Sequence, residues 1–122
     1  MNKNKVTFIL HKPQLSENIG ACARALKNFN FQKLYLIDPK PIFPNDKILA
    51  TSVGAKDIIK KSKVFNNLES SLGDIDILIA TSARFRNKNV KHINLEGLKK
   101  IDFRKNVGFL FGSEASGSVS YT

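Results

Sequence analysis

The sequence predicts an α/β domain with a mostly parallel sheet flanked by helices. Short apolar runs rich in β-branched residues, such as Val6–Leu10, have the pattern of buried strands. Stretches with apolar residues at helical spacing alternate with these runs. The first run, the helical stretch after it and the second run together span about 35 residues, the size of a βαβ unit with a right-handed crossover.

The first βαβ unit is predicted in the most detail. Its strands are Val6–Leu10 and Leu34–Ile37, and its helix is Asn18–Phe29. Asn18 can accept a backbone N–H as the N-cap, and Asn30 can take the left-handed conformation at the other end. Gly20 lets another backbone or a ligand approach the first turn of this helix.

The rest of the chain continues the alternation with shorter segments. The segment 39–44 holds three of the four prolines and is predicted to be an irregular loop. Further strands are expected at Lys63–Phe65, Ile75–Ala80 and Val107–Phe111, and further helices at Asp46–Ala50, Ala55–Lys61, Leu68–Leu72 and Leu95–Ile101. Within these strands, the charged Asp76 does not fit the apolar pattern.

Length and composition fit one globular domain. The chain has 122 residues, of which 42% are hydrophobic, enough for a single core. It has neither an apolar run long enough to span a membrane nor a signal-peptide pattern, so no membrane contact is expected. Cys22 is the only cysteine, which excludes an internal disulfide and favours a reducing cytoplasm. Cys22, His11 and His92 lack metal-ligand spacing, so no metal site is expected.

The charge of the chain has two interpretations. The net charge is +10, from 20 basic and 10 acidic residues, and such an excess favours a polyanionic partner such as nucleic acid. The basic residues are mostly lysines, and they are spread through the chain instead of forming one run. A biased genome composition explains that profile equally well, so the charge permits RNA binding without demonstrating it.

Three loops follow predicted strands at the edge where open parallel sheets bind ligands: Leu15–Gly20, Thr81–Arg86 and Gly112–Gly117. Their glycines alone are weak evidence, and no GxGxxG or Walker-type phosphate loop is present. Arg24 stands at the edge of the apolar stripe of its helix. From the pattern alone it is a surface arginine of an amphipathic helix, and Cys22 packs as a small apolar residue.

Four segments, taken in order, carry a family resemblance. They are Pro13–Phe29, Ala50–Asp57, Ala80–Arg84 and Phe109–Gly117. In this order they resemble the first motif, the alanine-glycine segment, the strand-end loop and the second motif of the SpoU branch of SPOUT methyltransferases. These enzymes are tRNA/rRNA 2′-O-methyltransferases with a knotted, Rossmann-like α/β fold. The likeness covers nearly the whole chain and is closest to the subgroup that methylates the wobble ribose of the tRNA anticodon loop.

The resemblance implies a role for each matching residue. Arg24 would be the catalytic arginine, and Asn18 a neighbour that orders the active-site loop. The cofactor would be S-adenosylmethionine and the partner tRNA or rRNA, and the residues implied in binding the cofactor are Thr81, Ser82, Ala83, Gly112 and Glu114. The reaction is an in-line attack of a ribose 2′-hydroxyl on the sulfonium methyl. Because a guanidinium is a poor general base, we interpret Arg24 as a bidentate phosphate clamp that polarises the 2′-hydroxyl.

The end of the chain departs from the family pattern. Ser113 stands where the family usually has arginine or proline, and the third motif would lie beyond Ser118–Thr122. We therefore expect a single SPOUT methyltransferase domain over residues 1–122 that is incomplete at the C-terminus and lacks the knot segment. The last strand is expected to end the sheet and leave the cofactor face uncovered. Weak or absent cofactor binding follows, and the homodimer of the family is in doubt.

Two other functions stay open at this point. The chain could be a non-catalytic RNA-binding or interaction module that keeps the basic surface alone, with binding that depends steeply on salt. It could also be a non-functional gene remnant that folds poorly and melts without cooperativity. Alternatively, the C-terminus is the ordinary end of a shorter, complete domain.

Overall fold

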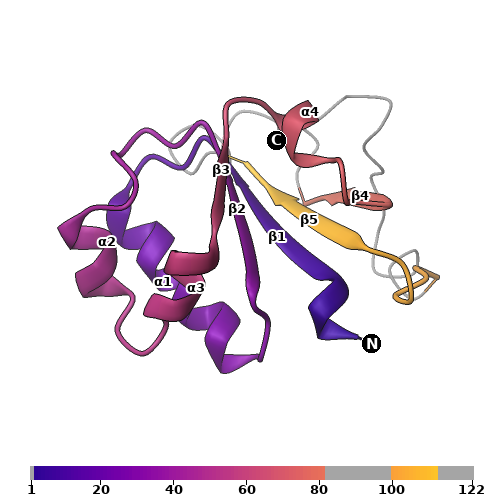
Figure 1. Ribbon diagram of the computed structural model, residues 1–122, viewed down its shortest axis with the longest axis horizontal. Helices are drawn as coiled ribbons and strands as arrows, with labels where there is room; N and C mark the ends of the chain where they lie inside the picture. The colour runs from indigo at the N-terminus through magenta and orange to yellow at the C-terminus, as the bar shows by residue number, and fades with distance from the viewer. Residues whose placement is uncertain (1, 82–99, 113–122) are drawn as a thin grey trace.

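The computed structural model describes residues 2–81 and 100–112. Their strands form one five-stranded, all-parallel sheet in the order β3-β2-β1-β5-β4 (Figure 1). The strands are β1 (Val6–His11), β2 (Lys33–Ile37), β3 (Lys63–Phe65), β4 (Ile77–Ala80) and β5 (Val107–Phe111). The predicted α/β class with a parallel sheet is confirmed.

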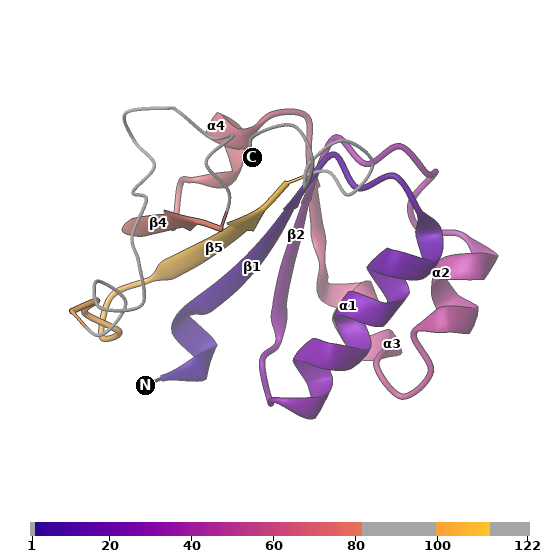
Figure 2. The same ribbon diagram turned by 180° about the vertical axis from the view of Figure 1, so that it is seen from behind.

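Helices cover both faces of this sheet. They are the 3-10 turn η1 (Lys3–Lys5) and the α-helices α1 (Ser16–Asn28), α2 (Asp46–Thr51), α3 (Lys56–Lys61) and α4 (Leu68–Ser71). The first three α-helices pack together beside β1 and β2, where Ile19, Ala23 and Leu36 belong to one buried cluster (Figures 1 and 2). A second cluster on the other face joins Leu68 of α4 to Ile9 and other sheet residues.

β1 is the central strand, and its side chains explain why. Val6 and Ile9 are fully buried, because β2 and β5 pair with both sides of the strand and helices cover its faces. Both predicted strands of the first βαβ unit are therefore present and adjacent, with Phe8 opposite Leu34 in the register. A run that is apolar on both faces is typical of an interior parallel strand.

Helix α1 begins earlier than the sequence indicates. Its first residue is Ser16, and the cap position is Leu15, which makes no side-chain capping bond; the prediction of Asn18 as N-cap is wrong. The physical reason lies outside the local sequence, because the Asn45 amide donates to the Ser16 hydroxyl at 3.0 Å and ties this end to the next loop.

The C-terminal end of α1 matches its prediction. Asn30 has a φ of 64°, and its N–H donates to the carbonyl of Lys27. The next N–H, from Phe31, donates to Leu26 at 2.9 Å, which completes a Schellman motif.

Two expectations about the last strands are wrong. β5 does not end the sheet; it lies between β1 and β4, and the edges are β3 and β4. β4 begins at Ile77, two residues later than predicted, because the Asp76 carboxylate accepts the N–H of Asn106 and fastens the loop before the strand. The predicted helix Leu95–Ile101 lies mostly outside the described residues, and Lys100 and Ile101 are not helical.

Candidate functional site

The loops at the carboxyl edge of the sheet are fastened to one another by backbone hydrogen bonds. Lys12 donates to Ile37 at 2.7 Å, Asp38 to Phe65 at 2.8 Å and Lys40 to Pro13 at 2.9 Å. Lys12 and Asp38 have φ values of 52° and 45°, in the left-handed region. Such backbone strain in non-glycine residues gathers where loops are held for function. This edge therefore has the build of a ligand-binding edge.

Thr81 and Gly112 lie together at this edge. β4 and β5 are adjacent parallel strands. Thr81 is the first residue after β4, and Gly112 is the first residue after β5. The backbone N–H and the hydroxyl of Thr81 both donate to the carbonyl of Leu110, at 3.0 and 2.9 Å. The hydroxyl oxygen of Thr81 keeps its lone pairs for a ligand donor, and the residue is exposed.

The other residues implied in cofactor binding fall outside the described part of the chain. Ser82 and Ala83 follow Thr81 directly, and Glu114 follows Gly112 by two positions. Their placement therefore stays a prediction.

Asn18 and Arg24 lie at different levels of α1. Asn18 is in the first turn, next to the carboxyl edge, whereas Arg24 is six residues further along, about 9 Å down the helix axis. Arg24 is exposed and lines a hollow of about 140 Å³ with Lys27, Asn28 and residues 53–55. The structure thus places Arg24 in a different hollow from the edge where Thr81 and Gly112 meet.

The segment Ala50–Asp57, singled out by its resemblance, forms the other wall of this hollow. Gly20 of α1 has no side chain, and Thr51 at the end of α2 lies directly against it. The prediction that Gly20 allows another backbone to approach the first turn of this helix is therefore confirmed. Gly54 follows with a φ of 81°, which turns the chain toward α3. The sequence motif carried no signal that residues 53–55 would neighbour Arg24.

Charges around α1 are partly paired. The described residues contain ion pairs between Lys27 and Asp57 at 2.8 Å and between Lys47 and Glu17 at 3.0 Å, and no ion pair there includes Arg24. The hydrogen bond from Lys27 lowers the pKa of Asp57 below its ordinary value. Within the described part of the chain, Arg24 thus differs from its neighbours Lys27 and Lys47, which are both ion-paired.

Cys22 lies on the same helix but on its inner side. It packs against the cluster that contains Ile19 and Ala23, as predicted for a small apolar residue. Burial raises the pKa of its thiol to about 11, so the thiolate is scarce at neutral pH.

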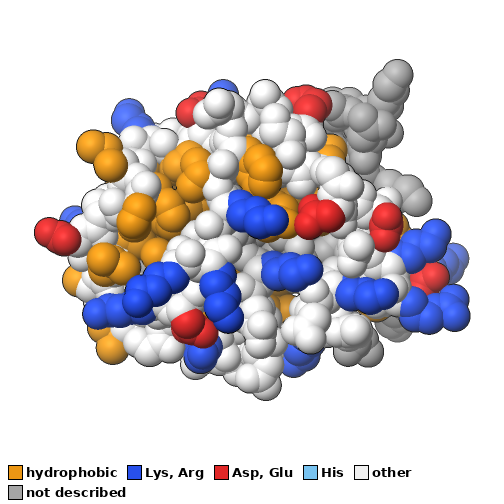
Figure 3. All heavy atoms as spheres, viewed as in Figure 1, with side chains coloured by type: hydrophobic (Ala, Val, Ile, Leu, Met, Phe, Trp, Pro, Cys, Tyr) orange, Lys and Arg blue, Asp and Glu red, His pale blue; other side chains and the backbone are white. Residues whose placement is uncertain are grey.

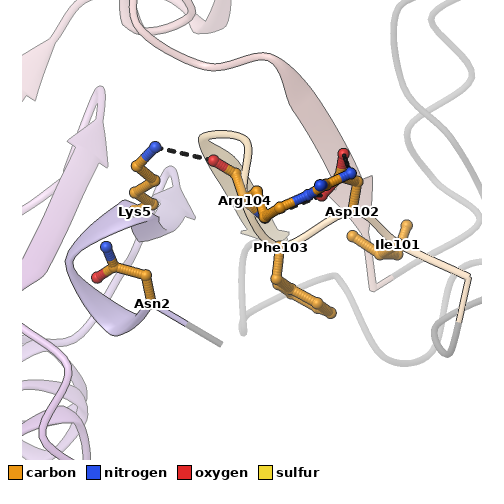
Figure 4. A pocket seen from close by; sticks show the side chains of 6 residues that line it. All are labelled: Asn2, Lys5, Ile101, Asp102, Phe103 and Arg104. Atoms are coloured by element: carbon orange, nitrogen blue, oxygen red, sulfur yellow. Dashed lines mark hydrogen bonds and ion pairs between the residues drawn. The ribbon is translucent and has the colours of Figure 1, made fainter.

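A second charged hollow lies at the opposite end of the sheet. Lys5 before β1 and the segment 101–104 before β5 line a cavity of about 340 Å³ (Figure 4). Lys5 donates to the carbonyl of Arg104 at 2.8 Å, and the Arg104 guanidinium pairs with Asp102 at 3.0 Å. Its charges are used internally and it lies away from the carboxyl edge, so it is not the candidate site.

Two negative findings bear on function. Among the described residues, no group of three or more His, Cys, Asp or Glu side chains could hold a metal ion. In the same part of the chain, no helix has the length and hydrophobicity to cross a membrane.

Comparison with known families and proteins gives a consistent result. The model of the SpoU rRNA methylase family matches residues 5–120. The tRNA (cytidine-2′-O-)-methyltransferase TrmJ of Methanocaldococcus jannaschii is 32% identical over 117 residues, which are 92% of this chain and 50% of that protein. The tRNA/rRNA methyltransferase LasT of Escherichia coli, described as uncharacterized, is 37% identical over 119 residues, 93% of this chain and 51% of that one.

Solved structures agree. TrmJ from Z. mobilis has a TM-score of 0.78 and 31% identity, over 93% of this chain and 52% of that chain. A probable methylase family protein from Haemophilus influenzae has a TM-score of 0.76 and 26% identity. The chain thus spans about half the length of the curated relatives that it matches.

Proposed function

Because this chain belongs to the SpoU rRNA methylase family, we propose that it takes part in methyl transfer from S-adenosylmethionine to a ribose 2′-hydroxyl of RNA. tRNA is the proposed substrate, since the M. jannaschii relative is named for tRNA. The observation that carries the proposal is that Thr81 and Gly112 directly follow two paired parallel strands, β4 and β5, at the carboxyl edge, the place where parallel sheets bind cofactors.

The chemistry of this edge fits the methyl donor. S-adenosylmethionine brings a sulfonium methyl group together with amino groups that donate hydrogen bonds. The Thr81 hydroxyl has given its own hydrogen to Leu110 and can therefore only accept from a ligand. An exposed acceptor beside Gly112 suits such a donor. Ser82, Ala83 and Glu114, which the family resemblance assigns to the same pocket, are proposed to complete it.

Arg24 is proposed to act on the RNA. Methyl transfer forms a bond between O2′ and the methyl carbon and breaks the bond between that carbon and sulfur, while the hydroxyl proton leaves to solvent or a base. A protonated guanidinium is a poor base but binds phosphate in a bidentate fork. Arg24 has no ion-pair partner among the described residues, which supports a clamp that aligns the ribose. Asn18 is proposed to order the loop at the start of α1.

Two further expectations accompany this proposal. The homodimer that the family resemblance implies is in doubt for this chain, and light scattering in solution tests it. A cytoplasmic location is proposed because Cys22 is the only cysteine. Calorimetry with S-adenosylmethionine tests the expectation of weak cofactor binding by residues 1–122.

A non-catalytic RNA-binding module is the second candidate. The net charge of +10 favours it, because such a chain binds polyanions whether or not it transfers a methyl group. A poorly folded gene remnant is less well supported: among the described residues, every buried polar side-chain atom has a hydrogen-bond partner.

The test is methyl transfer to an unmodified tRNA transcript with radiolabelled S-adenosylmethionine. Arg24→Lys keeps the charge but loses the fork, so we expect turnover to fall about 100-fold while tRNA binding stays within about threefold. Arg104→Lys, the same change in the hollow at the opposite end of the sheet, is the matched control and should keep its turnover. The same pair of substitutions in a full-length relative separates the role of the arginine from the length of the chain. Near-full turnover of Arg24→Lys in that relative would refute the clamp.

A further inference from the structure

A cluster of lysines surrounds a hollow at the amino ends of β2 and β3. The hollow has a volume of about 260 Å³, and Lys33, Lys61 and Lys63 line it together with Tyr35 and Asp74. We call these five residues the lysine hollow. The lysines come from three elements: Lys33 opens β2, Lys61 ends α3 and Lys63 opens β3. The hollow thus lies at the opposite end of these strands from the proposed cofactor edge.

The charges in the lysine hollow are not balanced. Within the part of the chain that the structure describes, the ion pairs involve other residues, and none includes these three lysines. The one carboxylate of the hollow, Asp74, accepts the hydroxyl hydrogen of Tyr35 at 2.8 Å. Lys63 lies over the Tyr35 ring, 5.7 Å from its centroid, which holds the ammonium group near the hollow. Three cationic side chains and one carboxylate give the hollow a net positive charge, which attracts an anion.

Two of the three lysines also have an ordinary explanation. Lys61 suits the C-terminal end of α3, where a cation opposes the helix dipole, and Lys63 protects an exposed edge strand from pairing with another chain. Neither explanation requires the side chains to line one hollow, and neither applies to Lys33. These explanations therefore do not account for the presence of three lysines around one hollow.

The surroundings favour a long anion over a small one. β3 and α3 lie toward the viewer in Figure 1 and away from the viewer in Figure 2. On the face turned to the viewer, Lys and Arg side chains extend in a row from the α2–α3 end to the β4–β5 end (Figure 3). A row of cations is the electrostatic footprint of a nucleic-acid backbone.

We propose that the lysine hollow is a contact site for the RNA phosphate backbone, separate from the site of methyl transfer. This proposal rests on the proposed function for one point, the choice of tRNA as the RNA that binds. Lys61 and Lys63 neutralise phosphates, whereas the negative charge of Asp74, which accepts the Tyr35 hydroxyl, opposes the contact. Contacts of this kind position the RNA without reading its sequence.

The test measures binding of an unmodified tRNA transcript from 50 to 200 mM KCl without methyl donor. We expect Lys61→Gln/Lys63→Gln to weaken binding about tenfold at the lowest salt and to reduce the salt slope by about 2, one for each lost phosphate contact. The matched control Lys3→Gln/Lys47→Gln removes the same charge from two lysines whose ammonium groups already have partners in the fold, the carbonyl of Phe29 and the carboxylate of Glu17, and should weaken binding by less than about threefold.

A third variant is expected to change tRNA binding in the opposite direction. Asp74→Asn keeps an acceptor for Tyr35 but removes the negative charge, so it should tighten tRNA binding about twofold to threefold. Thermal unfolding followed by circular dichroism checks that each variant is folded. Equal losses in the two lysine doubles, no loss in either, or weaker binding by Asp74→Asn would overturn the proposal. Because no methyl donor is present, these outcomes are independent of the Arg24 assay, which tests the proposed function.

Discussion

Gly20 is the position where one added methyl group has the largest predictable effect on this fold. A Cβ built on Gly20 would meet Thr51 of α2, with its Cβ at 2.8 Å and its backbone carbonyl carbon at 2.9 Å, while the side-chain hydroxyl lies closer still. The hydroxyl could rotate away, but the carbonyl carbon can move only if α2 moves. Gly20→Ala therefore forces α1 and α2 apart.

The effect of Gly20→Ala on the free energy of unfolding combines a loss and a gain. Overpacking against backbone costs about 3 kcal/mol, at the upper end of the usual range. Alanine in place of glycine within a helix returns about 1 kcal/mol. We therefore expect Gly20→Ala to lower the free energy of unfolding by about 2 kcal/mol. With a urea dependence of about 1.3 kcal/mol per M, the midpoint of unfolding falls by about 1.5 M.

The assay is urea unfolding followed by circular dichroism. Gly73→Ala is the matched control, because a Cβ there meets no atom within 4 Å, and its midpoint should stay within about 0.3 M of the parent chain. Gly20→Ala combined with Thr51→Ala removes the hydroxyl but not the backbone contact, so it should recover less than half of the loss. A midpoint for Gly20→Ala equal to that of the control would refute the close packing of α1 on α2.

Two other measurements follow from shifted pKa values. Burial, and then the hydrogen bond to Asp74, raise the pKa of Tyr35 to about 12, so the folded state holds this proton when the unfolded chain has lost it near pH 10. The contribution of Tyr35 to stability should therefore be constant below about pH 10 and fall between about pH 10 and 12. In urea titrations, Tyr35→Phe should remove this alkaline dependence. Burial raises the pKa of Cys22 to about 11, so iodoacetamide at pH 8 should label the native chain more than about tenfold more slowly than the urea-unfolded chain, and equal rates would contradict the buried thiol.

The strands of the sheet were predictable wherever a short apolar run marks them. Val6–Leu10 and Val107–Phe111 are apolar runs whose shortness and content of β-branched or aromatic residues favour a buried strand, and both strands are present. Their order was not predictable, because alternation of strands and helices fixes parallel pairing but not the side on which a later strand joins. Placing β5 next to β1 follows from tertiary pairing of Phe8 with Phe109.

The start of α1 shows the same limit. Local propensity favours Asn18 as the N-cap, whereas the helix begins at Ser16 with Leu15 at the cap position, a residue without a capping side chain. The Asn45 amide, which lies 29 residues further along the chain, decides for the earlier start by bonding to the Ser16 hydroxyl. Family resemblance, by contrast, named Arg24 from its local motif but said nothing of what lies opposite it.

The contact between Gly20 and Thr51 connects the stability of the fold to the proposed chemistry. Thr51 ends α2, and residues 53–55, which follow at once, form the wall facing Arg24. The depth of that hollow is therefore set by how closely α2 approaches α1. Thr81 and Gly112 follow β4 and β5, which this contact does not touch. Under the proposed function, Gly20→Ala should thus disturb the position of RNA at Arg24 and leave the cofactor edge intact, so the Michaelis constant for tRNA rises while affinity for the methyl donor is unchanged.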